Sequence, residues 1–476
     1  GEVGAFFMSE AELKTLVKGA VLTSGEAYDA ARATFNGVGE STRPKFVVMC
    51  ESPDDVAASV KFARANKLSL SVKGGGHNAA ARCVCDGVMI NNSKMDQVVY
   101  HAENETVDVG AGGLLEHVNV GLSGHKRGIA TGTVPITGVS GLTLGGGFSW
   151  CSRRHGLSID NVVSMKVVLA DGTQTVASAS ENADLFWALR GGGGNFAIVT
   201  EFTFKTHPLH EVWGGLRIYL LDPEQLKAFV EAFGASLAKN KDRRDLMELI
   251  GVVHPPGDKF MIGYGYCLLS EENDPSIAAH YAAFDSCFAS PGEAEAFGKT
   301  LWAQQQRVLL EKLFAQPPPP HRQYWGGGEC TNVADASYWS NMGQVISEYD
   351  FASFPFSLFV LEQWGGAIND VKPEDTLCAR SKEAAWVVVT GGPGGPEADG
   401  ARRDYAHSIN SKMNSHASAS PRMYVNYIPH TEADVDFWAR NYGGIETIQR
   451  ALSIKAKYDP DNVFNSSTLG NLVGKI

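Results

Sequence analysis

Glycine stands in four short runs along this chain, and these runs constrain the fold more than any other feature of the sequence. They are Gly74–Gly76, Gly145–Gly147, Gly191–Gly194 and Gly326–Gly328. Glycine makes up 52 of the 476 residues, about 11% against an ordinary share near 7%. Since 44% of the residues are hydrophobic, the chain is neither disordered nor collagen-like. Clustered glycine in a globular protein indicates backbone that approaches another group closely.

Length and charge limit the classes of protein to consider. A chain of 476 residues predicts two to three domains. The 41 Lys and Arg against 53 Asp and Glu give a net charge of −12, which argues against a nucleic-acid partner. The longest uncharged stretch, 128–152, holds seven glycines and a proline, so it does not predict a membrane helix.

The eight cysteines are too sparse for a disulfide scaffold. Cys83 and Cys85 have no second pair nearby, so we expect no zinc site and no other metal. A secretory signal already removed would leave no trace in this numbering, so the compartment stays open between secreted and cytoplasmic.

The pattern of the first 200 residues is α+β. Apolar strands are expected at 45–50, 68–73 and 196–208, and hairpins with turns at Glu103–Asn104 and at the two-residue turn Asp171–Gly172. Helices are expected after the Ser9–Glu12 capping box, after Ser52–Pro53 and over 181–190. Further on, 317–320 and 391–400 indicate loops, 357–366, 385–392 and 423–428 strands, and 432–443 and 445–458 helices.

Two of the glycine-rich segments directly follow predicted strands. Gly-Gly-Gly-His-Asn at 74–78 and the small-residue stretch 131–147 expose consecutive backbone N–H groups, which bind anions such as phosphate. A flexible turn is the alternative for either run alone. There is no P-loop motif. Gly192–Ala197 formally matches GxGxxA, but it follows a helix and precedes a strand, the reverse of the Rossmann order.

His77 lies inside the first of these loops. A lone histidine is more often structural than reactive. Within a loop that binds a pyrophosphate, an imidazole beside a flavin ring is a candidate for covalent attachment.

The long motifs resemble those of a known family. Residues 68–80, 131–162 and 184–202 are similar to the FAD-linked oxidases of the vanillyl-alcohol oxidase/p-cresol methylhydroxylase type. The C-terminal segments Tyr-Val-Asn-Tyr-Ile and Ile-Lys-Ala-Lys-Tyr-Asp-Pro-Asp-Asn-Val-Phe resemble the berberine-bridge-enzyme-like branch, and within it the hydroxynicotine-oxidase-like proteins.

The resemblance implies a two-domain α+β fold of this FAD-binding type. Residues 1–210 would form the FAD-binding domain, completed by 416–476, and 211–415 a substrate domain with an antiparallel sheet flanked by helices. His77 would be bonded to the 8α-methyl carbon of FAD. The other residues implied at the cofactor are Lys73, Gly74, Gly75, Gly76, Asn78, Thr133, Val134, Gly138, Ser140, Gly141, Gly147, Asn161, Ile198 and Asn426.

One position departs from the family pattern. Many members add a second flavin link through a cysteine in a G-x-C-P segment, and here that segment is Gly132-Thr133-Val134-Pro135. Cys151 is 17 residues away from Val134 and does not simply substitute. We therefore expect one covalent bond only, through His77.

The resemblance leaves two candidates for the catalytic base, Tyr427 and Glu362. A phenol with a pKa near 10 needs help from its surroundings to act at neutral pH. The alternatives are that Tyr427 only packs and that Glu362 points away into a salt bridge. Trp364, Trp386 and Val388 suggest an apolar substrate pocket, although aromatic residues at strand spacing are more often core.

The favoured function is that of an oxidase that transfers a hydride from a small alcohol or amine to FAD and reduces O₂ to H₂O₂. The alternatives are an oxidative cyclase or a dehydrogenase that reacts poorly with oxygen, and a catalytically silent binding protein. The expected partners are therefore a small-molecule substrate and molecular oxygen, with neither nucleic acid nor membrane, on a monomer or weak dimer.

Overall fold

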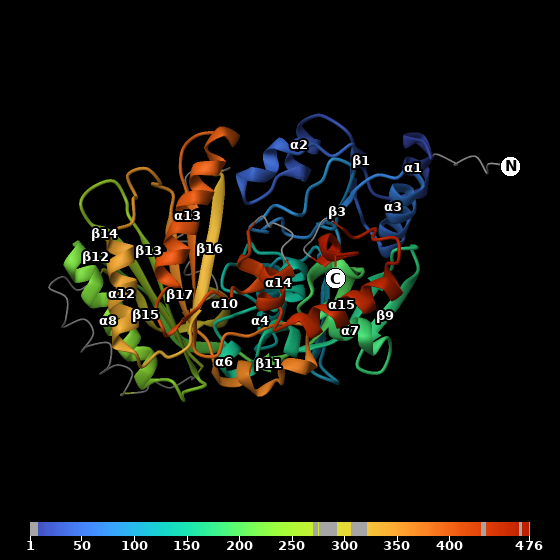
Figure 1. Ribbon diagram of the computed structural model, residues 1–476. Helices are drawn as coiled ribbons and strands as arrows, with labels where there is room; N and C mark the ends of the chain where they lie inside the picture. Colours follow the sequence, from blue (N-terminus) through green and yellow to red (C-terminus); the bar gives the residue numbers. More distant parts are fainter. Residues whose placement is uncertain are drawn as a thin grey trace.

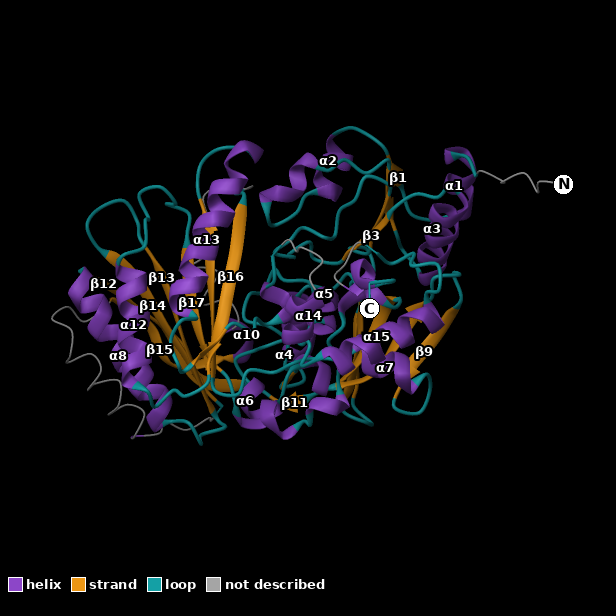
Figure 2. Cartoon of the chain, in the orientation of Figure 1, coloured by secondary structure: helices purple, strands orange, loops and turns teal. Residues whose placement is uncertain are grey.

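The computed structural model describes residues 8–269, 275, 293–305, 321–429, 435–465 and 469–475. In Figure 1 these residues form two lobes, with the N-terminal segments and the C-terminal helices together in one lobe and the middle of the chain in the other. Sheets lie inside both lobes, with helices on the outside (Figure 2). The proline run 317–320, which the sequence marks as a loop, lies outside the described residues.

The first sheet follows from the βαβ pattern at the start of the chain. Its strand order is β1-β2-β4-β3, and β4 pairs in parallel with both β2 and β3. Helix α3 begins where the sequence predicts, with Ser52 as its N-cap and Pro53 in its first turn. The elements are α1 (Glu10–Leu16), β1 (Val21–Leu22), α2 (Glu26–Arg32), β2 (Phe46–Met49), α3 (Pro53–Ala65), β3 (Leu70–Lys73) and β4 (Val88–Asn91).

The second sheet is antiparallel, in the order β5-β6-β10-β8-β9. Both predicted hairpins are present, as β5–β6 and β8–β9. The turn of the second is not the expected two-residue turn. Leu169 and Thr173 still pair, and Gly172 at φ +84° ends a three-residue loop. The elements are β5 (Val98–His101), β6 (Thr106–Gly110), α4 (Leu115–Ser123), β7 (Arg127–Gly128), α5 (Val139–Leu144), α6 (Ser152–His155), β8 (Val162–Val168), β9 (Gln174–Ser178), α7 (Ala183–Leu189), β10 (Ile198–Lys205) and β11 (His207–Pro208).

The third sheet, in the other lobe, has eight antiparallel strands in the order β15-β12-β14-β13-β17-β18-β16-β19. Helices α8, α12 and α13 cover one of its faces, and their apolar residues share a core with it. The elements are β12 (Glu211–Leu221), α8 (Pro223–Lys239), β13 (Leu246–Val253), β14 (Phe260–Leu268), β15 (Glu293–Leu301), α10 (Trp302–Gln305), β16 (Gln323–Cys330), α12 (Ala336–Ser347), β17 (Leu358–Gln363), β18 (Ala384–Gly391), α13 (Asp399–Met413) and β19 (Ala419–Ser420).

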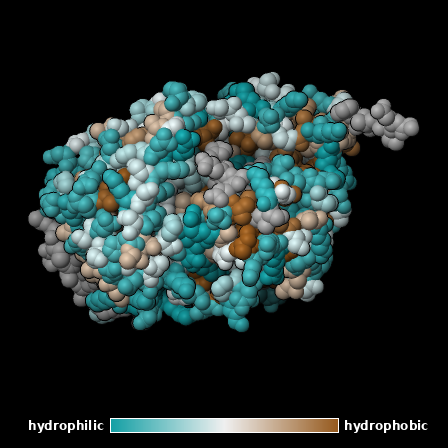
Figure 3. Space-filling model, in the orientation of Figure 1, coloured by the Kyte–Doolittle hydropathy of each residue, from teal (hydrophilic) through white to brown (hydrophobic). Residues whose placement is uncertain are grey.

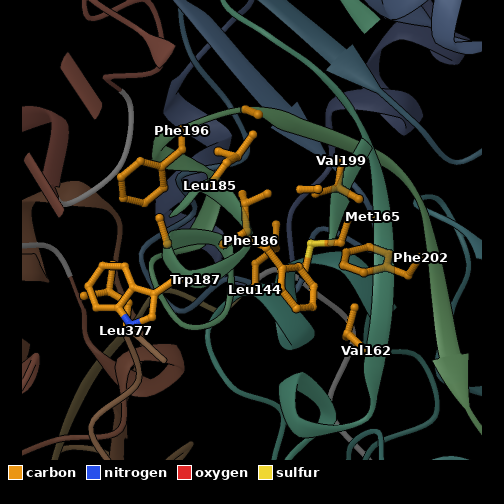
Figure 4. Close-up of a cluster of buried hydrophobic side chains, with 14 of the residues drawn as sticks. Leu144, Val162, Met165, Leu185, Phe186, Trp187, Phe196, Val199, Phe202 and Leu377 are labelled. Carbon is orange, nitrogen blue, oxygen red and sulfur yellow. The ribbon is translucent and has the colours of Figure 1, made fainter. Parts of the chain in front are cut away.

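The C-terminal segment returns to the first lobe. Helices α14 (Val435–Asn441) and α15 (Ile445–Tyr458) pack against the core of the second sheet, where Trp438 and Ile448 join Phe186, Phe196 and Phe202. Figure 4 shows part of this core, with side chains from β8, α7 and β10 meeting around Leu144. Residues 423–428, expected as a strand, instead form a tight turn over Val425–Tyr427. The domain boundaries themselves stay a prediction.

The glycine run Gly326–Gly328 lies in the middle of β16, under α13. A Cβ on Gly326 would lie 2.3 Å from Oδ1 of Asn410, and one on Gly328 would lie 2.4 Å from Oδ1 of Asn414. The run therefore allows α13 to approach the sheet closely.

No helix within the described ranges combines the length and the hydropathy that a bilayer crossing needs. The face shown in Figure 3 is mostly hydrophilic, and its more hydrophobic residues gather toward the middle of the view, between the lobes.

Candidate active site

A cavity of about 370 Å³ lies where the loops of the first lobe meet the eight-stranded sheet. Its walls come from parts of the chain that are far apart in the sequence. They are the glycine loops at 74–78, 133–145 and 193–199, the strands β16, β17 and β18, and the C-terminal residues 424–427, Tyr442 and Phe464.

The first two glycine loops touch each other in the cavity wall. A Cβ on Gly75 would lie 2.3 Å from the backbone N of Gly138, and a Cβ on Gly138 would lie 2.3 Å from the N of Gly75. Gly76 has φ +72°, which favours glycine. Because neither loop tolerates a side chain at these contacts, bare backbone faces the cavity, which is the arrangement that cradles a phosphate group.

His77 follows this loop and faces the same cavity. Its ring stacks on Phe35 at 3.9 Å between centroids and 18° between planes. Its Nε2 atom is buried and has no hydrogen-bond partner among the described residues. Burial lowers the pKa of the imidazole to about 4, so the ring is neutral at physiological pH. A buried polar atom without a partner needs an explanation, and a ligand in the cavity supplies one.

The second loop lines the cavity through Thr133, Val134, Gly138, Ser140 and Gly141. Val134 therefore presents an apolar, unreactive side chain at the position where the family pattern has a cysteine. Cys151 is fully buried in a hydrophobic cluster beside Trp150 and does not line the cavity. Cys83 does line the cavity, and burial raises the pKa of its thiol to about 11, which leaves it protonated.

Glu362 and Tyr427 meet in the cavity. Glu362 lies near the end of β17 and is 2% exposed, and the Tyr427 hydroxyl donates a hydrogen bond of 2.7 Å to its Oε1. Nε1 of Trp364 donates to Oε2 at 3.3 Å. Burial raises the pKa of the Glu362 carboxyl to about 7, and burial together with the neighbouring carboxylate raises the pKa of Tyr427 well above its ordinary value. The Glu362 carboxyl can therefore gain or lose a proton near pH 7, while the Tyr427 phenol keeps its proton.

The C-terminal turn is fixed to the second glycine loop by its own side chains. Nδ2 of Asn426 donates to the carbonyl of Leu142 at 2.9 Å and to the Tyr424 hydroxyl at 2.7 Å. The Tyr424 hydroxyl also accepts the N–H of Gly147 at 2.6 Å. Asn426 and Ile198, both expected near the cofactor, line the cavity.

Three residues expected at the cofactor have other partners and do not line the cavity. Nζ of Lys73 donates to the carbonyls of Ala31 and Ala33, at the end of α2. Nδ2 of Asn161 donates to two backbone carbonyls, and its Oδ1 lies 2.6 Å from Nε2 of His207. Gly147, at φ +83°, packs against Ser158.

The residues expected to form the substrate pocket also lie outside the lining. Side chains alternate between the two faces of a strand, so Val387 and Val389 of β18 face the cavity while Trp386 and Val388 face the core under the helices. Trp364 lies behind the lining, where it stacks on Phe148 at 4.6 Å and donates a hydrogen bond to Glu362. Their positions do not support a substrate-pocket role.

Other residues of the cavity wall were not foreseen from the sequence. Arg82 follows the His77 loop closely, so its charge beside a glycine-rich loop was a usable signal. Tyr442, Phe464 and Trp325 carried no such signal, because only the fold brings them to the cavity. The described ranges contain no group of three or more His, Cys, Asp or Glu side chains placed to hold a metal.

Comparison with known proteins agrees with this cavity. The family model described as "FAD binding domain" matches residues 44–178, and the one described as "Berberine and berberine like" matches 423–468. These segments contribute the first two glycine loops, with His77, and the turn with Tyr427, so the site is that of an FAD-linked oxidoreductase.

The chain belongs to the vanillyl-alcohol oxidase/p-cresol methylhydroxylase superfamily, in its berberine-bridge-enzyme-like branch. The uncharacterized FAD-linked oxidoreductase YgaK of Bacillus subtilis is 32% identical over 95% of this chain and 96% of its own length. Two fungal relatives match over less of their length. They are the FAD-dependent monooxygenase tpcD of Cochliobolus heterostrophus (36% identical, 41% of this chain and 38% of that protein) and the FAD-linked oxidoreductase pgmH of Aspergillus terreus (34%, 52% and 51%).

Solved structures share the whole fold at low sequence identity. The 6-hydroxy-D-nicotine oxidase of Arthrobacter nicotinovorans superposes with a TM-score of 0.81 at 20% identity, over 95% of this chain and 97% of that one. BBE-like 1 of Physcomitrella patens gives a TM-score of 0.83 at 22% identity, over 97% and 99%. These similarities confirm the predicted α+β fold of this FAD-binding type.

Proposed function

We propose that this FAD-linked oxidoreductase is an oxidase that binds FAD covalently through His77 and oxidises a small alcohol or amine, with O₂ reduced to H₂O₂. The observation that carries the proposal is the hydrogen-bonded pair of Glu362 and Tyr427, which lies in the same cavity as the glycine loops and His77.

The residues present fit FAD. The bare backbone at Gly74–Gly76 and Gly138 suits the diphosphate, and Thr133, Ser140 and Asn426 offer polar groups along the cavity. The Nε2 atom of His77, which has no hydrogen-bond partner in the described part of the chain, supports a ligand at this position. Bound FAD would supply a two-electron acceptor that takes a hydride from the substrate.

His77 suits a covalent bond to the 8α carbon because its imidazole is neutral. A glucooligosaccharide oxidase of Acremonium strictum with the same fold is described with a 6-S-cysteinyl, 8α-N1-histidyl FAD. In this chain Val134 lines the cavity where the family's linking cysteine is expected, so we propose a single link.

Glu362 and Tyr427 together can take the proton that leaves the substrate. The Tyr427 hydroxyl donates to Glu362, so its oxygen lone pairs are free to accept an O–H or N–H hydrogen from the substrate. Tyr427 then passes its own proton to Oε1 of Glu362, and the carboxylate, with a pKa of about 7, is the final acceptor. Trp364 holds the second carboxylate oxygen in place.

The experiment that tests the proposal is reduction of the purified yellow protein without oxygen by a panel of alcohols, cyclic amines and sugars. We expect at least one alcohol or amine to bleach the flavin and, in air, to release H₂O₂. Bleaching without reoxidation by air would contradict the oxidase and indicate a dehydrogenase. Protein that stays colourless when expressed with ample FAD would contradict flavin chemistry altogether.

A further inference from the structure

One wall of the cavity, on the eight-stranded sheet, is almost wholly apolar. β16, β17 and β18 present Trp325, Leu358, Val360, Val387 and Val389 to the cavity. Val360, Val387 and Val389 form one buried cluster, and Trp325, Leu358 and Tyr427 pack against it. Alternation along three adjacent strands makes this a continuous surface that reaches as far as Tyr427.

Two polar side chains of these strands line the wall, Gln323 and Glu362, and their oxygens already accept hydrogen bonds. Gln323 accepts the Nε1–H of Trp325 at 3.2 Å through its side-chain oxygen. Both oxygens of Glu362 accept hydrogen bonds, from Tyr427 and from Trp364. The Trp325 ring lies 5.8 Å from that of Tyr427. The polar centre formed by Glu362 and Tyr427 is therefore one point at the edge of an apolar surface.

Such a wall discriminates between substrates by the number of their hydroxyl groups. A hydroxyl that loses water without gaining a partner costs about 1–3 kcal/mol. A sugar ring carries a hydroxyl on nearly every carbon, and the sheet wall offers them no set of partners. An apolar ring on the same wall gains roughly 25 cal/mol for each Å² that it removes from water.

We propose, building on the proposed function, that the substrate carries its oxidisable hydroxyl or amino group on a compact apolar ring and that sugars are excluded. Trp325, Val360, Val387 and Val389 are the specificity-determining residues. The apolar ring lies against them, and its one polar group reaches Tyr427.

Matched ring compounds test this class. Flavin reduction without oxygen is followed in stopped flow with cyclohexanol, cyclohexylmethanol and cyclohexylmethylamine, and with glucose, lactose and xylobiose. We expect the reduction rate constant divided by the dissociation constant to be at least 100-fold higher for the best apolar compound than for any sugar. A sugar that reduces the flavin as efficiently as the best apolar compound would overturn the inference while leaving the oxidase function intact.

A binding measurement keeps the two proposals separate. Phenol has one hydroxyl on an apolar ring and no hydrogen on the carbon that bears it, so it binds without being oxidised. Phenol and myo-inositol, which has a hydroxyl on every ring carbon, are each titrated into the protein, and the change in flavin absorbance gives the dissociation constant of each. If phenol binds at least tenfold more tightly but no alcohol or amine reduces the flavin, the inference stands and the proposed function fails. Equal or tighter binding of myo-inositol would refute the apolar site.

Variants assign the effect to the wall. The double substitution Val387→Gln with Val389→Gln places amides on the apolar surface, and we expect phenol binding to weaken at least tenfold. The pKa of the bound flavin, read from its absorbance spectrum, should stay unchanged, which shows that the cofactor site is intact. Val120→Gln on α4, where Val120 is 70% exposed, is the matched control and should bind phenol as the natural chain does. Unchanged phenol binding in the double variant would contradict the assignment.

Discussion

At the scale of single residues, the proposed chemistry depends on a carboxyl group whose pKa burial raises to about 7, that of Glu362. Glu362 is buried, and among the described residues its carboxylate receives two hydrogen bonds, which do not offset the loss of solvation that raises its pKa. Tyr427, which is far from titrating on its own, gains an acceptor for its proton through this contact. Because neither residue is an adequate base alone, we propose that the two act as a pair.

Glu362→Gln should therefore abolish most proton removal. We expect the rate of flavin reduction in the natural chain to rise with pH and reach half its maximum near pH 7, because the carboxylate form is the acceptor. In Glu362→Gln this rise should disappear and the rate should fall by about 10²–10⁴-fold, as for loss of a general base. Stopped-flow reduction from pH 5.5 to 9 measures both. A variant that keeps the pH dependence would show that another group accepts the proton.

The residues at the site were foreseeable from the sequence to an uneven degree. His77 and Gly74–Gly76 stood in a motif long enough to be recognised, and they line the cavity. Lys73 and Asn161 lie beside such motifs, but their side chains turn toward backbone carbonyls, which no motif reports. The role of each lining residue stays a prediction until the cofactor is measured.

At the scale of secondary-structure elements, the positions of the strands in the sequence were easier to predict than which of their side chains face the cavity. β17 and β18 were both expected, yet Trp386 and Val388 face the helices while Val387 and Val389 face the cavity. Every residue of β18 is buried, so alternating hydrophobicity cannot tell one face from the other. The strand expected at 423–428 does not form. Its apolar and aromatic residues suit a strand, but hydrogen bonds of Tyr424 and Asn426 hold a turn instead.

Substitutions along β18 test which of its residues face the core and which face the cavity. Val388→Ala removes a side chain that is fully buried in the core, and we expect the free energy of unfolding to fall by about 2 kcal/mol with little change in phenol binding. Val387→Ala should have the smaller effect on stability and the larger effect on phenol binding, because its side chain faces the cavity. Urea unfolding and flavin absorbance titration distinguish them, with Val163→Ala, 45% exposed, as the control. The opposite order of effects would mean that the two faces are exchanged.

At the scale of the whole molecule, individual buried side chains tie together segments that are distant in the sequence. Arg153 of α6, 2% exposed, donates to the carbonyls of Trp364, Leu246 and Arg243 and so ties the first lobe to the eight-stranded sheet. The C-terminal turn brings Tyr427 across to Glu362 in the same way. The overall fold was predicted because long motifs identified it, whereas these ties are single side-chain contacts that the sequence does not mark.

A pair of stacked histidines makes the stability of the molecule sensitive to acid. His155 of α6 and His207 of β11 stack at 3.8 Å, and burial lowers their pKa values to about 3 and about 4. In the unfolded chain both have a pKa near 6.5. Below pH 6.5 the unfolded state therefore takes up protons that the folded state does not, and stability is lost as the pH falls toward 4.

Urea unfolding at pH 7.5 and at pH 5 measures this loss. The free energy of unfolding should be lower at pH 5 than at pH 7.5. We expect His155→Gln to reduce this difference in free energy by up to about 1.4 kcal/mol per pH unit below 6.5. His125→Gln, an exposed histidine, should keep the full difference. A loss of stability that is the same in all three proteins would assign the acid sensitivity to other groups.

Mass spectrometry after denaturation tests whether the glycine loops and His77 hold FAD by a single covalent bond. Protein expressed with ample FAD is precipitated with acid, washed, and measured intact and as peptides. We expect the mass of the chain plus one flavin, carried on the peptide that contains His77, and the mass of the bare chain for His77→Ala. A natural chain that loses its flavin on denaturation, a flavin retained by His77→Ala, or a second peptide bonded to the same flavin would contradict a single bond through His77.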